Sequence, residues 1–169
     1  FNNIGAILHP IPTVLNCGRI ENTKGNFLHY VEGITPAVGK IIAKADYERM
    51  QVAEALGAKP ISLTEWLGYT YDAYGTTVCG IKAPDTLDTR YISEDVPQSL
   101  VPIADMGRHL GIKTPIIDSI IHMASIIHDK DYYEIGRKVS DMGLEGLSVD
   151  EIRNYVIYGE IFKSEGVVV

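Results

Sequence analysis

Residues 35–57 read TPAVGKIIAKADYERMQVAEALG, a stretch that marks both ends of a long helix. Thr35 and Pro36 favour the N-cap and the first helical position, and Gly57 is typical of the residue just after a helix. The apolar residues between them recur about every 3.6 residues, which predicts an amphipathic helix lying on a core. Arg49 falls in the middle of this apolar stripe. Either it reaches solvent or pairs with a neighbouring carboxylate, or it anchors a substrate carboxylate or another domain.

Helical patterns also occupy most of the remaining chain. Further helices are predicted over three segments with the same periodicity, residues 64–74, 96–110 and 114–128. Pro102 implies that the regular part of its helix starts late or is kinked. A last helix begins at Ser148, where Glu151 completes a capping box. Strand signals are confined to residues 27–31 and 167–169, so the predicted fold class is all-α, a bundle of about six or seven helices.

Length and composition indicate one globular domain. With 169 residues, of which 46% are apolar and 22% charged, the chain can bury a sizeable core. A net charge of −7 without a cluster of Lys and Arg argues against nucleic acid as a partner. No apolar run reaches the about 18 residues that a membrane span needs. Cys17 and Cys79 have no CxxC spacing, and two thiols in a chain with its own core favour a reducing compartment, so a cytoplasmic protein is expected.

Residues 3–21 read NIGAILHPIPTVLNCGRIE and carry the strongest candidate for chemistry. His9 lies in an otherwise apolar stretch beside Pro10 and Pro12, which restrict the backbone. An imidazole in such a rigid, poorly hydrated setting suits proton transfer near neutral pH. The pattern also fits a core histidine that makes one hydrogen bond. The local sequence by itself leans to this second interpretation, because isolated histidines are usually structural.

Five stretches, in this order along the chain, resemble a single family. The first contains Asn3, His9-Pro10 and the run LNCGRI at residues 15–20. The others are YVEGITPAVGKII from Tyr30, DYERMQVAEALG from Asp46, SEDVPQSLVPIADMGRHLG from Ser93 and KTPIIDSII from Lys113. Together they resemble the C-terminal helical domain of the NAD(P)-dependent opine dehydrogenases of the octopine and nopaline type, over roughly residues 4–158.

The resemblance implies a fold, a reaction and a second domain. The fold would be a helical bundle similar to the C-terminal domain of 6-phosphogluconate dehydrogenase. Opine dehydrogenases condense an amino acid with an α-keto acid and reduce the imine with NADH or NADPH, so these substrates and one of these cofactors are expected. The chain has no GxGxxG, and the family's Rossmann domain lies N-terminal to this region. Residues 1–169 are therefore expected to be the substrate half alone, inactive in isolation, with an apolar face around His9 where the Rossmann domain docks.

The resemblance also implies a catalytic pair. His9 would exchange protons with the amine and with the carbinolamine oxygen, and Asp118 would hold its other ring nitrogen. The spacing gives a local alternative. Asp118 and His122 are four residues apart on one helical face, so they could pair with each other instead.

Candidates for binding the substrates come from three parts of the chain. Lys113 precedes Asp118 by five residues and would bind a carboxylate, although a lysine lacks the bidentate fork of arginine. The alternative interpretation of Lys113 is a solvated loop residue. Arg19 and Arg108 are further cations, and Arg19 could instead be a structural link to the loop around Glu21. Trp66 heads an aromatic group that would line a side-chain pocket or pack in the core. No HExxH or CxxC motif is present, so no metal is expected.

Two other functions remain open at this point. A hydroxy-acid or ketopantoate-type dehydrogenase would keep the helical fold but would use a catalytic lysine in place of a His–Asp pair. A non-catalytic module would only pair subunits, since helical domains of this superfamily often form homodimers.

Overall fold

The computed structural model describes residues 3–74 and 80–160, apart from the side chains of residues 70–74. Its helices are α1 (Gly5–Leu8), α2 (Pro10–Leu15), α3 (Cys17–Thr23), α4 (Pro36–Ala55), α5 (Leu63–Tyr74), α6 (Arg90–Ser93), the π-helix η2 (Val96–Leu100), α7 (Val101–His109), α8 (Pro115–His128), α9 (Tyr132–Ile135) and α10 (Val149–Tyr158). Extended pairing in the described part is limited to one antiparallel bridge, Leu28 with Lys82. The all-α prediction is confirmed, whereas the strand expected over 27–31 is reduced to this bridge. The strand signal at 167–169 lies outside the described residues.

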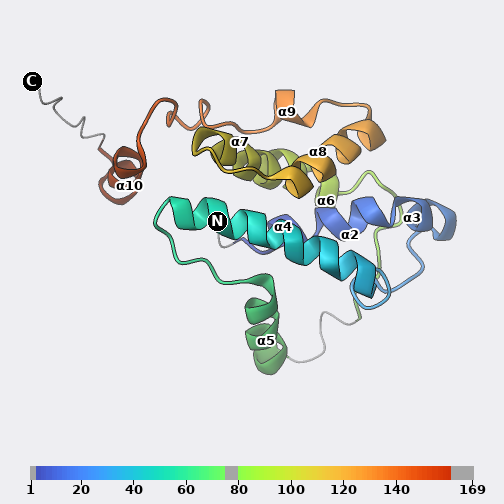
Figure 1. The fold of residues 1–169 in the computed structure, drawn as a ribbon. Helices are drawn as coiled ribbons and strands as arrows, with labels where there is room; N and C mark the ends of the chain where they lie inside the picture. Colours follow the sequence, from blue (N-terminus) through green and yellow to red (C-terminus); the bar gives the residue numbers. More distant parts are fainter. Residues whose placement is uncertain (1–2, 75–79, 161–169) are drawn as a thin grey trace, which may run out of the picture.

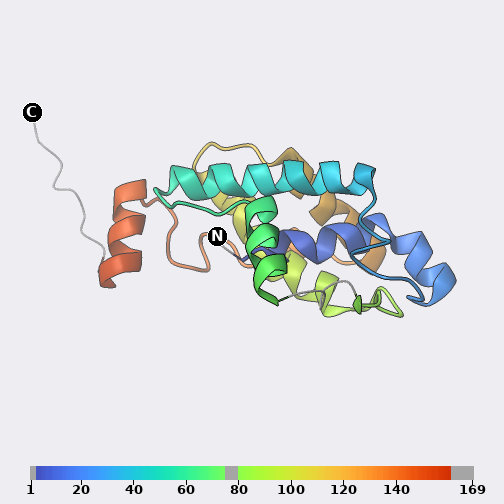
Figure 2. The same cartoon turned by 90° about the horizontal axis from the view of Figure 1, so that it is seen from below.

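The helices gather around α4, which crosses the molecule (Figure 1). Helix α4 contacts α1 and α2, and it also contacts α7 and α8. In both views α3 and α10 lie at opposite ends of the molecule (Figure 2), and Figure 1 shows α5 projecting away from the bundle. None of the helices in the two described ranges combines the length and the apolar character that crossing a bilayer requires.

Helix α4 begins and ends where the sequence predicts. The Thr35 hydroxyl accepts a hydrogen bond from the N–H of Val38 at 3.4 Å, and Pro36 is the first helical residue. Gly57, just beyond the end of the helix, has a φ of 75°, a left-handed conformation that glycine adopts at little cost. The local signals therefore predict both ends of this helix correctly.

The buried face of α4 also carries charged side chains. Arg49 is fully buried, and its Nε donates to the Asp46 carboxylate at 2.8 Å while its Nη2 donates to the carbonyl of Ile61 at 2.7 Å. Of the interpretations left open for Arg49, pairing with a neighbouring carboxylate is confirmed. These contacts tie α4 to the segment that leads into α5.

Glu48 joins α4 to α8. Its carboxylate accepts hydrogen bonds from the N–H groups of Ile116 and Ile117, with closest distances of 3.0 Å to each. These are two of the unpaired N–H groups in the first turn of α8, so Glu48 caps that helix from a distant part of the chain. Burial raises the pKa of Glu48, and the two N–H groups oppose this effect.

Residues 4–23 fold into α1, α2 and α3, although the sequence did not predict helices there. Two prolines in six residues argue against a helix, yet Pro10 and Pro12 occupy the first turn of α2, where no N–H is needed. His9 joins α1 to α2 and keeps helical backbone angles, with φ −88° and ψ −58°. The prolines thus fix the position of His9 within a nearly continuous helical run.

The helix predicted over 96–110 is divided into η2 and α7. Pro102 is near the start of α7, so the expected late start of the regular part is confirmed. The wider turn of η2 directly follows Asp95, and such π-turns often occur at functional sites. The capping box at Ser148 and Glu151 is formed as predicted at the start of α10.

Candidate active site

His9 and Asp95 form a hydrogen-bonded pair between the first helices and η2. The His9 Nδ1 lies 3.0 Å from Oδ2 of Asp95, although the two residues are 86 positions apart in the sequence. Their side chains are 33% and 17% exposed, so the pair is sheltered but still reachable from outside. An imidazole whose Nδ1 is held by a carboxylate leaves Nε2 available for proton exchange with a bound molecule.

Two more residues fix the orientation of the His9 ring. The Tyr91 ring stacks on it, with ring centroids 4.6 Å apart and an interplanar angle of 17°. On another side, a Cβ placed on Gly5 would lie 2.9 Å from Cε1 of His9, which is closer than van der Waals contact allows. The absence of a side chain at Gly5 therefore makes room for the ring.

A second histidine lies behind the Tyr91 ring. His29 is fully buried, its ring centroid is 5.3 Å from that of Tyr91, and neither of its nitrogens has a hydrogen-bond partner among the described residues. Burial lowers the pKa of His29 to about 4, and the charge of nearby His9 adds to this effect. Burial also raises the pKa of Tyr30, with further contributions from Tyr91 and Asp95. His29 and Tyr30 are therefore both neutral near pH 7.

This burial of His29 predicts a loss of stability in acid. The folded chain resists protonating His29 until about pH 4, whereas an unfolded histidine binds a proton near pH 6.5, so the unfolded state binds more protons between these values. The free energy of unfolding should therefore fall by up to about 3 kcal/mol from this group as the pH drops from 7 to 4. Urea unfolding at several pH values would measure this decrease in the free energy of unfolding.

The matched variants for this prediction are His29→Phe and His122→Gln. Phenylalanine fills the same buried space without a titratable nitrogen, so the slope of stability against pH should become shallower. His122 is exposed, and its replacement should leave the wild-type slope. Equal slopes in wild type and His29→Phe would contradict the prediction.

Asp118 does not contact His9. Its carboxylate accepts hydrogen bonds from Nη2 of Arg108 at 3.1 Å, from the Thr114 hydroxyl at 3.3 Å and from the Tyr133 hydroxyl. The prediction that Asp118 holds the His9 ring is therefore wrong, because the first turn of α8 directs this carboxylate toward α7 and α9. Asp95 occupies that place instead.

The local alternative, a pair between Asp118 and His122, is also not formed among the described residues. Burial raises the pKa of Tyr133, and its hydrogen bond to Asp118 acts in the same direction. The guanidinium of Arg108 lies 4.4 Å from the centre of the Tyr133 ring. Asp118 thus belongs to a polar cluster that connects α7, α8 and α9.

The expected substrate-binding residues lie apart from one another. Lys113 is exposed and lines a hollow that it shares with Arg108 and Asp118. Arg19 is held by the Glu32 carboxylate at 2.7 Å and lies over the ring of Phe27, so it makes a structural link, but to Glu32 and not to the loop around Glu21. Trp66 is half-buried and packs against the main core. A role in substrate binding therefore stays a prediction for Lys113, Arg19 and Trp66.

Sequence reasoning missed Asp95 and the residues around it. Asp95 stands in the quoted stretch SEDVPQ, and the available signal was a pair of acids just ahead of a proline-containing helix start. Arg90, one residue before Tyr91, is an exposed cation whose Nε donates to Glu94 at 3.0 Å. The Glu94 carboxylate raises the pKa of Arg90, and the charge of Asp95 acts in the same direction.

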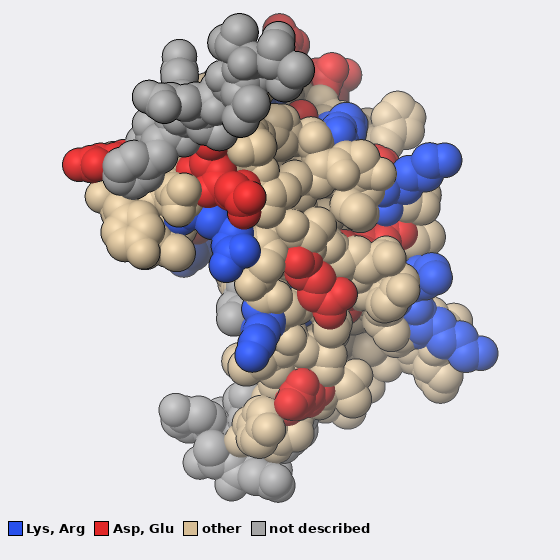
Figure 3. All heavy atoms as spheres, turned by 60° about the vertical axis from the view of Figure 1, so that its left-hand side comes forward, with Lys and Arg blue, Asp and Glu red and all other residues tan. Residues whose placement is uncertain are grey.

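Two exposed parts of the surface differ in character. Arg90 and Glu94, close to Asp95 in the sequence, are exposed and charged. The exposed apolar side chains of Val156, Ile157 and Tyr158 lie on α10, at the end of the molecule opposite α3 (Figure 1). Figure 3, which brings the α10 side of the molecule forward, shows charged residues scattered among uncharged ones. The apolar face expected around His9 therefore stays a prediction.

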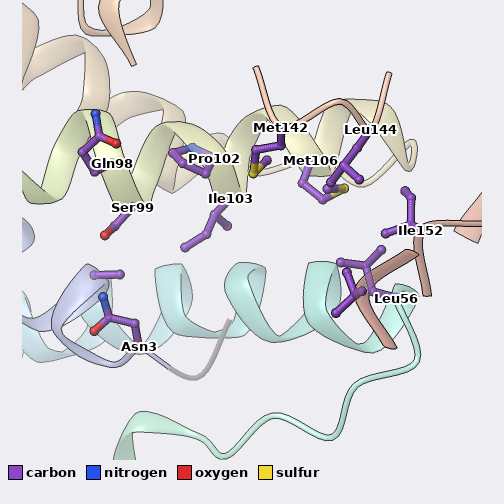
Figure 4. Close-up of a pocket in the computed structure, with 12 residues that line it drawn as sticks. Asn3, Leu56, Gln98, Ser99, Pro102, Ile103, Met106, Met142, Leu144 and Ile152 are labelled. Atoms are coloured by element: carbon purple, nitrogen blue, oxygen red, sulfur yellow. The ribbon is translucent and has the colours of Figure 1, made fainter. Parts of the chain in front are cut away.

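A cavity of about 340 Å³ opens near the pair, between the start of the chain and α7 (Figure 4). Asn3, Gln98 and Ser99 lie toward one end of it, and apolar side chains such as Leu144 and Ile152 lie toward the other. Within residues 3–74 and 80–160 there is no group of three or more His, Cys, Asp or Glu that could hold a metal ion. The same ranges contain no strand–loop–helix unit that could cradle a dinucleotide.

Comparison with known proteins gives consistent matches. Residues 1–128 match the model of the NAD/NADP octopine/nopaline dehydrogenase alpha-helical domain. The chain is 37% identical over 164 residues to an opine dehydrogenase of Arthrobacter sp. (strain 1C), covering 91% of this chain and 45% of that protein. It is 25% identical to vitopine synthase of Allorhizobium ampelinum (86% of this chain, 43% of that protein) and 24% identical to Protein ocs of Agrobacterium tumefaciens (90% and 45%). The chain thus spans about half the length of the curated relatives it matches.

Proposed function

The chain belongs to the NAD/NADP octopine/nopaline dehydrogenase family, whose alpha-helical domain it contains, and from this premise we propose that it supplies the acid–base and substrate-binding groups of an opine dehydrogenase. The reaction would join the amine of an amino acid to an α-keto acid and reduce the product with NADH or NADPH. The observation that supports this proposal best is the His9–Asp95 pair, a partly exposed imidazole held by a carboxylate. A nucleotide-binding domain N-terminal to this chain would bind the cofactor.

His9 is the proton-exchanging group in this proposal. A neutral His9, with Nδ1–H donating to Asp95, takes a proton from the substrate ammonium group at Nε2, and the free amine then attacks the keto carbon. The same Nε2–H returns the proton to the carbinolamine oxygen, which leaves as water. When bound, NADH or NADPH supplies the hydride that reduces the imine carbon. Asp95 is the positioning residue, since it fixes the tautomer and balances the positive charge on the imidazolium.

Arg90 is the cation best placed to bind a substrate carboxylate. It lies next to Tyr91, which stacks on His9, and its planar guanidinium can bind a carboxylate through two hydrogen bonds. Lys113 remains a second candidate, at the hollow beside Asp118. We place the reaction in the cytoplasm, where the thiol of Cys17, which is free within the described part of the chain, would stay reduced. Association into a homodimer remains a prediction.

Replacing Gly5 by alanine should lower kcat by about 10–100-fold with little loss of stability. The added Cβ would lie 2.9 Å from Cε1 of His9 and would displace the ring from Tyr91 and Asp95. Steady-state kinetics together with urea unfolding would separate the two effects. Gly18→Ala is the matched control, because Gly18 is also helical and a Cβ there meets nothing within 4 Å. Equal kcat values for the two variants would show that the His9 ring tolerates displacement.

The reaction itself can be tested with the full-length protein. NADH or NADPH oxidation should require both pyruvate, or another α-keto acid, and an amino acid. Oxidation with the keto acid alone would indicate a simple keto-acid reductase and would exclude the opine assignment. Mass spectrometry of the product should detect a secondary amine that carries both carbon skeletons.

A further inference from the structure

Two residues that line the 340 Å³ cavity, Asn3 and Ser99, are neighbours of the His9–Asp95 pair, although the pair itself does not line the cavity. A Cβ placed on Gly5 would lie 3.1 Å from Oδ1 of Asn3 and 2.9 Å from Cε1 of His9. The Asn3 side chain and the His9 ring are therefore neighbours. Asn3 also lines the cavity, so one wall of the cavity is formed by a neighbour of the His9 ring. On the opposite wall, Ser99 follows Asp95 by about one helical turn and also lines the cavity.

Polar and apolar groups are separated along this cavity. The amides of Asn3 and Gln98 and the hydroxyl of Ser99 lie toward the end near the pair (Figure 4). Beyond them the lining is apolar, and none of the residues that line the cavity has a charged side chain. Met106 and Met142 contribute flexible side chains that can adapt to ligands of different shape.

We propose that this cavity binds an apolar side chain of the amino-acid substrate, an inference that rests on the proposed opine dehydrogenase function. With the substrate amine at His9 Nε2, the side chain would extend past Asn3 and Ser99 into the apolar part. A volume of about 340 Å³ has room for a bulky aliphatic or aromatic group. A guanidinium or ammonium group there would lose its hydration without finding a charged partner, so basic amino acids are disfavoured.

The test compares amines in the full-length protein at saturating pyruvate and cofactor. For the wild type, kcat/KM should be at least about tenfold higher for L-leucine and L-phenylalanine than for L-arginine. Met142→Glu places a carboxylate on the half-buried far wall, and the ratio of kcat/KM for leucine to that for arginine should then fall by about tenfold or more. The effect should appear mainly in KM for the amine, while KM for pyruvate changes little.

Ile157→Glu is the matched control for Met142→Glu. It makes the same apolar-to-acid change on α10, at a residue that is 63% exposed and lines a neighbouring hollow but not this cavity. The leucine-to-arginine ratio should stay at the wild-type value. If Met142→Glu does not fold, the wild-type preference by itself still decides the inference.

The possible failures can be told apart. If no amine supports cofactor oxidation, the proposed function fails. If amines react but arginine is preferred, or if Met142→Glu lowers kcat/KM equally for all amines, the proposed function stands and the side-chain pocket is overturned. Light scattering of Met142→Glu tests a further alternative. If the oligomeric state changes while the leucine-to-arginine ratio of kcat/KM does not, the side-chain pocket is overturned and the cavity is assigned to a subunit contact.

Discussion

Replacement of His9 by asparagine is expected to lower kcat of the full-length protein by about 10²–10⁴-fold, with little effect on folding. Asparagine can still donate a hydrogen bond to Asp95, but it cannot take a proton from the amine or return one to the carbinolamine oxygen. Steady-state kinetics with the preferred amine, pyruvate and NADH or NADPH would measure the loss. A kcat within a few-fold of wild type would contradict the assignment of His9 as the acid–base group.

The two carboxylates considered for His9 should behave differently. Asp95→Asn should lower kcat strongly and change the pH profile of kcat/KM, because the imidazole loses the charge that orients it. Combining it with His9→Asn should add little further loss, since the two residues act as one unit. Asp118→Asn is the matched control and should keep the wild-type pH profile, because its contacts are with Arg108, Thr114 and Tyr133. If Asp118→Asn changed kcat and the pH profile and Asp95→Asn did not, Asp118 would be the partner of His9.

Replacement of Arg49 by methionine is expected to lower the free energy of unfolding by about 3–5 kcal/mol. Methionine fills part of the same volume but removes the counter-charge of the buried Asp46 carboxylate and the hydrogen bond that Arg49 Nη2 donates to the Ile61 carbonyl. Urea unfolding followed by circular dichroism would give the difference.

Arg90→Met provides the control for this change. Arg90 also pairs with a carboxylate on its own helical segment, but its side chain is 79% exposed, so the loss of stability should be too small to measure. An equally small loss of stability for Arg49→Met would contradict the prediction and would mean that water or a neighbouring side chain replaces Arg49 as the partner of Asp46.

Much of the fold could be predicted because its signals are local. Thr35 and Gly57 determine the ends of α4, and Ser148 with Glu151 determines the start of α10, through hydrogen bonds that span only a few residues. The helices at the start of the chain escaped prediction for the opposite reason. Prolines usually interrupt helices, and whether Pro10 falls in a first turn depends on where α1 ends.

The sequence by itself singled out His9, because an imidazole between apolar residues and prolines is chemically conspicuous whatever surrounds it. Tertiary structure decided which carboxylate it meets. Asp95 is 86 residues away, and only the packing of α2 against α6 brings it within 3.0 Å, while Asp118 is turned toward Arg108 and Tyr133. Helix periodicity and capping act over one or two turns, so they determine which segments form helices and where these helices end. Contacts between elements depend on how side chains from the whole chain fill a common core, which no local pattern specifies.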